Sequence, residues 1–189
     1  MSWINPLKRD SPDTLVAPPL NIIIINSKKN EEFNDKHRRL IAKIAPICIA
    51  YNFHLTLVNF QLNSSQLNFA KEIAPATSIG SGGEKLITLA EKGRLQISVL
   101  PISNNFGKKI ILTSKPDQKK SIDINQIAKI STEKKIALIF GTDDKRNKNI
   151  NRLLDNSEYH CDVSNKNIKL ELDTEIGAIT TIIHKIRTT

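Results

Sequence analysis

The sequence has few cysteines, few aromatic residues and no long apolar segment. Its two cysteines, Cys48 and Cys161, stand far apart and outside any Cys-x-x-Cys pair, which argues against a structural zinc site. Aromatic residues make up only 5% of the chain, which argues against an aromatic-rich stacking surface for single-stranded nucleic acid.

The most apolar stretch, residues 40–51, contains Lys43 and Pro46 and is shorter than the ~20 residues needed to span a bilayer. We therefore expect no membrane segment. Two isolated thiols and no secretory leader predict a cytoplasmic protein.

Positive charge is in excess, with 28 Lys and Arg against 19 Asp and Glu and a net charge of +9. This balance favours polyanionic partners such as RNA. The lysines are spread along the chain, so a generally basic surface explains the balance equally well. Hydrophobic residues at 39% and charged residues at 25% are typical of a folded globular protein.

Two regions differ in composition. Residues 1–19 contain four prolines and few periodic apolar positions, which predicts a loosely packed tail. Residues 20–189 are enough for a single domain of ordinary size.

Strand-like and helix-like segments alternate along this domain. Branched apolar runs predict buried strands at residues 21–26, 54–60, 95–100, 109–113 and 136–140. Helical spacing predicts helices from Asn34 or Asp35 onward and at residues 65–74, 84–92 and 121–130. Pro46 is expected to kink or divide the first helix, because an interior proline costs ~3 kcal/mol. The alternation predicts an α/β fold with a mostly parallel sheet flanked by helices.

The last quarter of the chain has its own order. The strand at 136–140 ends at Gly141, and a polar loop (142–149) follows. Strand-like pieces at 159–163 and 168–172 are separated by a loop, and an amphipathic helix (173–186) ends the domain. This order is expected around a ligand pocket at the carboxyl edge of a parallel sheet.

Catalytic and metal-binding motifs are weak. Gly80-Ser-Gly-Gly-Glu-Lys85 fails the P-loop pattern, and a simple helix entry is the better interpretation. The four histidines lack metal-ligand spacing, so no metal site is predicted. His160 is a candidate base, although a structural histidine is the more ordinary interpretation. Lys115 follows the fourth strand, where it either holds an RNA phosphate or lies in solvent.

The terminal helix carries isoleucines at helical spacing, and small residues lie beside them. Gly177 and Ala178 would allow close packing against a folded loop or a second subunit. An ordinary core-facing helix explains the isoleucines equally well. The isoleucines are Ile176, Ile179, Ile183 and Ile186.

Several segments, taken in order, resemble the SPOUT (α/β-knot) methyltransferase superfamily. The chain is most similar to an uncharacterised archaeal SPOUT-like family, the domain of unknown function 531. The resemblance extends from about residue 20 to 187. The segments that carry it are His37-Arg-Arg-Leu40 with Ile44-Ala-Pro-Ile47, Thr77-Ser-Ile-Gly80, Leu112-Thr-Ser-Lys-Pro-Asp117, Tyr159-His-Cys-Asp-Val-Ser164 and Leu170-Glu-Leu-Asp-Thr-Glu-Ile-Gly-Ala-Ile179.

The resemblance implies a C-terminal trefoil knot, an S-adenosylmethionine cofactor, a tRNA or rRNA substrate and a homodimer packed through the terminal helix. It gives Arg38, Arg39 and Arg146 as catalytic candidates, and Lys115, Lys145 and Arg146 as RNA-binding residues. The implied cofactor contacts are Leu112, Thr113, Gly141, Cys161, Val163, Leu170 and Leu172.

The chain also departs from the superfamily pattern. The loop after Gly141 has no second glycine and carries Asp143 and Asp144, whose charge would repel the anionic end of the cofactor. The usual asparagine-containing entry to the last helix is replaced by Leu170-Glu-Leu-Asp-Thr174. Two alternatives to a methyltransferase are therefore retained. One is a non-catalytic SPOUT-fold protein that binds RNA or senses the cofactor, and the other is a small-metabolite enzyme on an ordinary doubly wound sheet.

Overall fold

One six-stranded sheet forms the centre of the protein, and every strand pairing in it is parallel. The computed structural model describes residues 17–27, 33–62, 64–76, 81–142 and 148–189. The strand order is β3-β2-β1-β5-β4-β6, which confirms the predicted α/β class. The strands are β1 (Asn21–Ile25), β2 (His54–Val58), β3 (Leu95–Ser98), β4 (Lys108–Leu112), β5 (Ile136–Gly141) and β6 (Tyr159–Cys161).

The central strand β1 is a run of four isoleucines that is buried on both faces of the sheet. Ile22 and Ile24 face one apolar cluster, and Ile23 and Ile25 face the other. Side chains alternate between the faces of a strand, so a two-faced core requires an uninterrupted apolar run. The isoleucine run is therefore what places β1 at the middle of the sheet.

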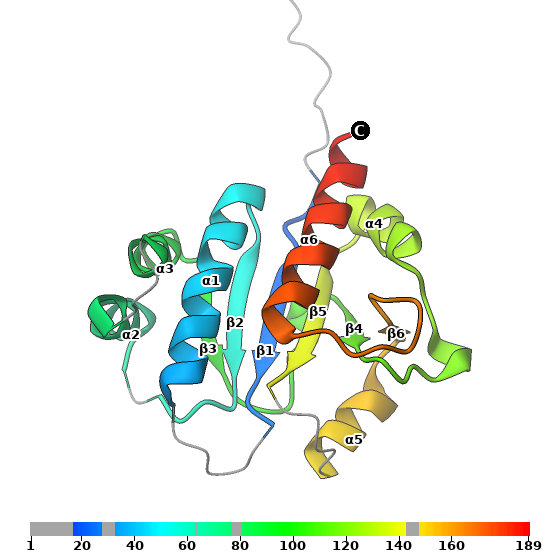
Figure 1. Cartoon of the computed structure of the whole chain (residues 1–189), viewed down its shortest axis with the longest axis horizontal. Coiled ribbons are helices and arrows are strands. Elements are labelled where there is room, and N and C mark those ends of the chain that lie inside the picture. The colour runs from blue at the N-terminus through cyan, green and yellow to red at the C-terminus, as the bar shows by residue number, and fades with distance from the viewer. Residues whose placement is uncertain (1–16, 28–32, 63, 77–80, 143–147) are drawn as a thin grey trace, which may run out of the picture.

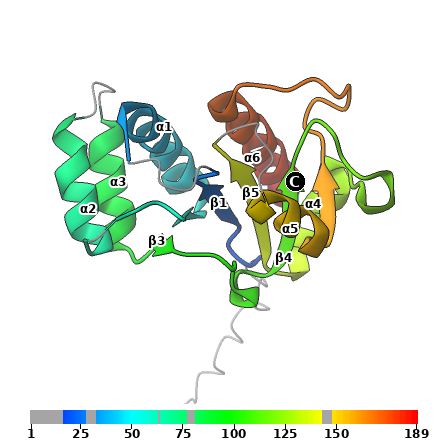
Figure 2. The same cartoon turned by 90° about the horizontal axis from the view of Figure 1, so that it is seen from below.

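Five helices cover one face of the sheet. The last helix lies between α1 and α4 on this face (Figure 1), and Figure 2 shows the same layer from below. These helices are α1 (Asp35–Tyr51), α2 (Gln66–Ile73), α3 (Gly82–Glu91), α4 (Ile124–Glu133) and α6 (Leu172–Thr188). The opposite face is covered by Leu100, Ile102 and Phe106 and by Leu153 and Leu154 of α5 (Lys148–Asn156).

Pro46 does not divide the first helix, which was one of the two predicted outcomes, and a kink stays a prediction. Helix α1 continues through it from Asp35 to Tyr51. A proline has no N–H, so Pro46 cannot donate to the carbonyl of Ala42 four residues earlier. The helix survives because its apolar face, which includes Ile41, Ile44 and Cys48, is fully buried against the sheet.

The freed carbonyl of Ala42 lies against the start of α3. A Cβ atom placed on Gly82 would be 2.5 Å from the Ala42 oxygen, which is closer than a real Cβ contact allows. The glycine-rich segment is thus needed, at Gly82, for helix–helix packing. Residues 77–80, which hold its first glycine, lie outside the described ranges.

Other predicted boundaries need correction. Residues 168–171 form no strand, and they lead directly into α6 at Leu172. The polar loop predicted to 149 ends earlier, because α5 begins at Lys148. Helix α4 (Ile124–Glu133) begins later than the predicted residue 121 and is capped by Asp123, whose side chain accepts from Gln126 N.

Within the described residues, no helix is long and apolar enough to cross a membrane. The tail and the knot stay predictions, because residues 1–16 and 143–147 lie outside the described ranges.

The Gly82 contact gives a direct test of this packing. We expect Gly82→Ala to lower the free energy of unfolding by about 2 kcal/mol, because the added methyl group meets the backbone of α1. Gly177→Ala is the matched control. Its Cβ would lie 3.9 Å from Ile47 Cδ1, an ordinary contact, so we expect about 0.5–1 kcal/mol of stabilisation. Urea denaturation of both variants measures the difference, and equal stabilities would contradict the close approach of α1 and α3.

Candidate functional site

The carboxyl ends of β4, β5 and β6 meet at one edge of the sheet. Leu112 pairs with Cys161, and Thr113 N donates to Cys161 O at 2.9 Å. Gly141, the last residue of β5, pairs with Ile25 of β1. Strand order reverses between β1 and β5, so β5 borders the topological switch point at which open α/β sheets bind ligands.

The loop after β6 is held in place by Asp162. Its Oδ1 atom accepts hydrogen bonds from Ser164 N at 3.1 Å and from Ser164 Oγ at 2.8 Å, while Oδ2 accepts from Asn167 N at 2.6 Å. Ser164 Oγ in turn accepts from Ile168 N at 3.1 Å. Asn165 and Asn167 have φ angles of 51° and 57°, the left-handed conformation that asparagine tolerates. Residues 162–168 therefore form an ordered wall beside the strand ends.

Carboxylates gather where this wall meets α6. Burial raises the pKa of Glu175 to about 7, and Asp162 adds to the rise while Lys169 opposes it. Asp173 is tied to α1 by a 2.5 Å ion pair with Lys43. The hydrogen bond from Lys43 is the main cause that lowers the pKa of Asp173. The start of α6 thus carries one partly neutral carboxyl group and one firmly ionised carboxylate.

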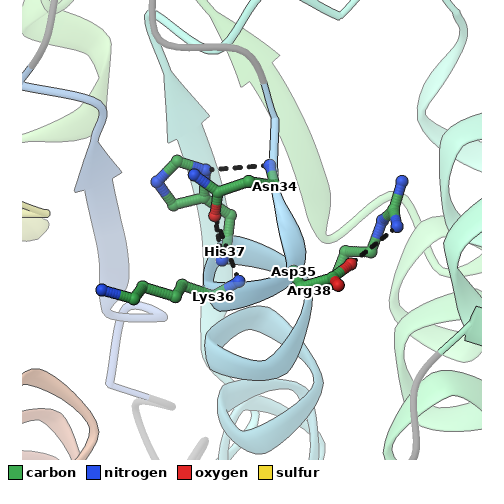
Figure 3. Close-up of polar contacts among 5 residues, drawn as sticks. All are labelled: Asn34, Asp35, Lys36, His37 and Arg38. Carbon is green, nitrogen blue, oxygen red and sulfur yellow. Dashed lines mark hydrogen bonds and ion pairs between the residues drawn. The ribbon is translucent and has the colours of Figure 1, made fainter.

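The start of α1 completes the same edge. Asn34 caps the helix by accepting from Lys36 N at 3.1 Å and His37 N at 3.2 Å, and His37 Nδ1 accepts from Asn34 N at 3.3 Å (Figure 3). Lys36 and Arg38 extend from α1 in opposite directions (Figure 3). Arg38 pairs with Asp35 at 2.9 Å on the side away from Lys36.

Arg39 lies one helical turn before Lys43, and residues four apart share a helix face. Because Lys43 contacts Asp173, Arg39 is on the side of α1 that faces α6. The two neighbouring arginines therefore serve different sides of the helix. Of the predicted catalytic candidates, Arg39 lies on the α6-facing side of α1, next to the edge where β4, β5 and β6 end (the strand-end site), and Arg38 lies on the side that meets α2. Arg146 and Lys145 lie outside the described residues.

A family described as "Protein of unknown function (DUF531)" matches residues 20–184. The chain belongs to the DUF531 family. It is 34% identical over 167 residues to the uncharacterized protein MJ0224 of Methanocaldococcus jannaschii, covering 87% of this chain and 93% of that protein.

Solved structures of low sequence identity share the fold. A probable methyltransferase from Bordetella pertussis aligns with a TM-score of 0.59, 13% identity and coverage of 89% of this chain and 95% of that one. The TrmH/SpoU tRNA modifying enzyme of A. aeolicus has a TM-score of 0.52, 12% identity and coverage of 92% and 78%. The SpoU methyltransferase AviRb of Streptomyces viridochromogenes, in complex with AdoMet, aligns with a TM-score of 0.51 and 11% identity. The alignment covers 97% of this chain and 64% of that one. This DUF531 chain therefore has the fold of SPOUT methyltransferases.

The structure sorts the predicted cofactor contacts of this DUF531 chain into two groups. Leu112 and Cys161 are buried at 7% and 0% exposure, so only their backbone atoms face the edge. Burial, then nearby carboxylates, raise the pKa of the Cys161 thiol to about 12, so it stays protonated. The other five lie half-exposed around the edge: Thr113, Gly141, Val163, Leu170 and Leu172. Their contact with a cofactor stays a prediction.

His160 has a structural role in the DUF531 chain. Its Nδ1 atom accepts from Asp117 N at 3.0 Å, so the proton is on Nε2, which lies 3.1 Å from Leu154 O and 3.0 Å from Ser157 Oγ. Lys120 Nζ also donates to Leu154 O at 3.0 Å. These bonds join β6, α5 and the segment after β4. With both ring nitrogens engaged, His160 is not available as a base.

Lys115 lies exposed beside this network and lines a hollow of about 530 Å³ that also includes Lys120 and His160. Its proposed contact with RNA stays a prediction. Among the described residues, no group of three or more His, Cys, Asp or Glu side chains could hold a metal ion. Lys120 and Glu175 carry no recognisable signal in the sequence, because their surroundings are brought together only by the fold. Asp162 was missed although its partners, Ser164 and Asn167, are local.

Glu175 makes stability depend on pH. Its folded-state pKa lies above its ordinary value of 4.5, so the folded protein holds a proton that the unfolded chain has lost between about pH 4.5 and 7. We expect the free energy of unfolding to fall as pH rises through this window and to level off above it. Glu175→Gln should remove this slope, making the variant more stable than the parent at pH 8 and similar to it at pH 4.5.

Asp173→Asn is the control, because the pKa of Asp173 is shifted in the direction opposite to that of Glu175. The lowered pKa of Asp173 gives a contribution that is lost only as pH falls through the acid range, below the ordinary value of 3.8. Urea titrations across the pH range measure both effects. A Glu175→Gln profile that runs parallel to the parent would contradict the burial of this carboxyl group.

Proposed function

We propose that the protein is an S-adenosylmethionine-dependent methyltransferase that acts on RNA, with tRNA or rRNA as the substrate class. The observation that carries the proposal is the meeting of the carboxyl ends of β4, β5 and β6 beside the switch point, in a fold shared with an AdoMet-bound SpoU methyltransferase. The substrate class is supported by the fold shared with a tRNA modifying enzyme and by the net charge of +9.

The residues at the edge fit the chemical parts of this cofactor. Val163 and Leu172 pack on the core with part of each side chain accessible, so they offer an apolar surface to an adenine ring. The backbone at Thr113 and Gly141 would supply hydrogen-bonding groups at the strand ends. Asp162 and the partly neutral Glu175 provide negative potential suited to a sulfonium ion.

Bound S-adenosylmethionine supplies an electrophilic methyl group, and the chain must align an acceptor with it. Arg39, on the α6-facing side of α1, is placed to hold an RNA phosphate or to favour deprotonation of the acceptor by its charge. The exposed lysines, including Lys115, extend the basic surface for the rest of the RNA.

The proposed active unit is a homodimer packed through α6. Ile176, Ile179 and Ile183 are used in the core of the single chain. Ile182 and Ile186, however, remain 41% and 39% exposed on the outer side of the same helix. An apolar pair on an exposed helix face is typical of a subunit contact.

A non-catalytic role is favoured by one observation. Asp173 and Glu175 occupy the first turn of α6, and Asp162 adds a third carboxyl group nearby. This charge opposes binding of the carboxylate end of S-adenosylmethionine. A protein of this kind would bind RNA, or sense the cofactor, without transferring a methyl group.

Calorimetry with S-adenosylmethionine tests the proposal. We expect micromolar affinity for the parent protein and about tenfold weaker affinity for Gly141→Val, because the added side chain occupies the edge where β5 ends. Gly141 lies in a strand, so valine suits its backbone and the fold should be retained. Val99→Ser is the matched control, at a 69% exposed position beyond the end of β3.

Four results have separate meanings. Binding to the parent with transfer of a labelled methyl group to tRNA or rRNA supports the enzyme. Binding without transfer to any RNA favours the cofactor-sensing role. No binding at millimolar ligand rejects the cofactor assignment, and unchanged affinity in Gly141→Val rejects the placement of the site.

A further inference from the structure

A second concave surface lies on the other side of α1 from the strand-end site. It has a volume of about 480 Å³, within the range of small-ligand pockets. Its walls come from the start of α1, the segment after β2, and α2. The residues that the argument uses are Phe33, Arg38, Gln61, Phe69 and Glu72.

The floor of this hollow is aromatic, although aromatic residues are scarce in the chain. Three of the six phenylalanines gather here, with ring centroids 5.2 Å apart for Phe33 and Phe69 and 5.9 Å apart for Phe33 and Phe60. Phe69 is only 2% exposed, whereas Phe33 is half-exposed and lines the hollow. Flat apolar side chains at the base of a pocket favour a planar, aromatic occupant.

The walls carry one unused donor and one carboxylate. Arg38 Nη1 is bonded to Asp35, and its guanidinium carbon lies 5.9 Å from the centre of the Phe33 ring. Its Nη2 atom makes no hydrogen bond within the described part of the chain, whereas its Nε atom is too buried to meet a ligand. Glu72 places an exposed carboxylate on the same hollow, and Gln61 adds an amide.

The hollow and the strand-end site share one edge of the sheet. Gly141 pairs with Ile25, and Ile25 pairs with Val58, so Gly141 and Val58 are two strand spacings, about 10 Å, apart. Gln61 follows Val58 by three residues. A base in the hollow is therefore too far from Gly141 to carry the acceptor atom itself, but close enough to belong to a neighbouring nucleotide.

We propose that this hollow binds a guanine base that flanks the acceptor nucleotide of the RNA. Guanine presents an oxygen beside two N–H groups along one edge. The unbonded Nη2 group of Arg38 matches the oxygen, the carboxylate of Glu72 matches the two N–H donors, and Phe33 supports the ring. A carboxylate on the wall also disfavours a phosphate as the occupant. The assignment rests on the proposed function only in taking RNA as the substrate.

Binding of short RNAs tests the assignment. Fluorescence anisotropy at one fixed salt concentration would compare UUGUU, UUAUU and UUCUU labelled at the same end. We expect roughly tenfold tighter binding of UUGUU by the parent protein. Arg38→Gln and Glu72→Gln should each bring the three affinities close together. Circular dichroism melting shows whether these variants retain the fold, which we expect because Glu72 is exposed and Arg38 is partly so.

Lys36→Gln is the matched control, since it removes one positive charge from the same turn of α1 on the side away from the hollow (Figure 3). This variant should bind all three RNAs more weakly by the same factor, so that the ratio of their affinities is unchanged. Equal affinities in the parent, or a guanine preference that survives both hollow variants, would overturn the assignment.

A separate measurement distinguishes this assignment from the proposed function. Arg38→Gln should bind S-adenosylmethionine as tightly as the parent does, because the hollow and the cofactor edge lie on different sides of α1. A parent protein that prefers guanine but binds no S-adenosylmethionine would reject the methyltransferase and support the hollow. A parent protein that binds S-adenosylmethionine but shows no guanine preference would support the methyltransferase and reject the assignment of the hollow.

Discussion

The contact between the start of α3 and the backbone of α1 decides where the functional surfaces lie. Pro46 leaves the Ala42 carbonyl without its helical donor, and Gly82 lets α3 come against this oxygen. The contact fixes the first half of α1 relative to the layer formed by α2 and α3. The ion pair between Lys43 and Asp173 then relates the other side of α1 to α6. Both sides of a single helix are thus positioned by backbone packing and one pair of charges.

This arrangement explains how two adjacent arginines come to have different environments. Successive residues on a helix point about 100° apart, so a rigid α1 sends Arg38 toward α2 and Arg39 toward α6. The edge near α6 is rich in carboxyl groups, whereas α1 contributes Arg39 and Lys43. Opposite charges therefore face each other across the strand-end site. A zwitterionic molecule such as an amino-acid conjugate is compatible with this charge distribution, provided that its positive group lies near α6 and its negative group near α1.

The sheet could be predicted from the sequence because its strands are runs of branched apolar residues. Asn21–Ile25 and Ile136–Gly141 were found within one residue on that basis. The segment 168–172 also looked like a strand, but Lys169 and Glu171 belong to a loop that enters α6 at Leu172. Helix α5 was missed because only one side of it meets the core, through Leu153 and Leu154. The order of elements in the last quarter predicted a ligand pocket at the carboxyl edge of the sheet, and the resemblance to SPOUT proteins supplied the individual cofactor-contact candidates.

Interactions that join distant residues were beyond the reach of sequence patterns. Nothing in the local sequence shows that Gly82 meets Ala42 or that Glu175 is partly desolvated near Asp162. Such features depend on the final packing. The glycine-rich segment illustrates the point. Its pattern looks like a phosphate-binding loop, but at Gly82 a glycine is required because a side chain would collide with the backbone of Ala42.

The short strand β6 has a consequence for local motion. It has only three residues and pairs along β4 alone, with an added bridge between Ser121 and His160. The imidazole of His160 and the ammonium group of Lys120 tie this strand to α5 and to the segment after β4. These pieces share their hydrogen bonds, so they should open and close as one cooperative unit. Slow amide exchange at this margin of the sheet would then report the integrity of the whole unit, and the walls of the strand-end site would loosen together.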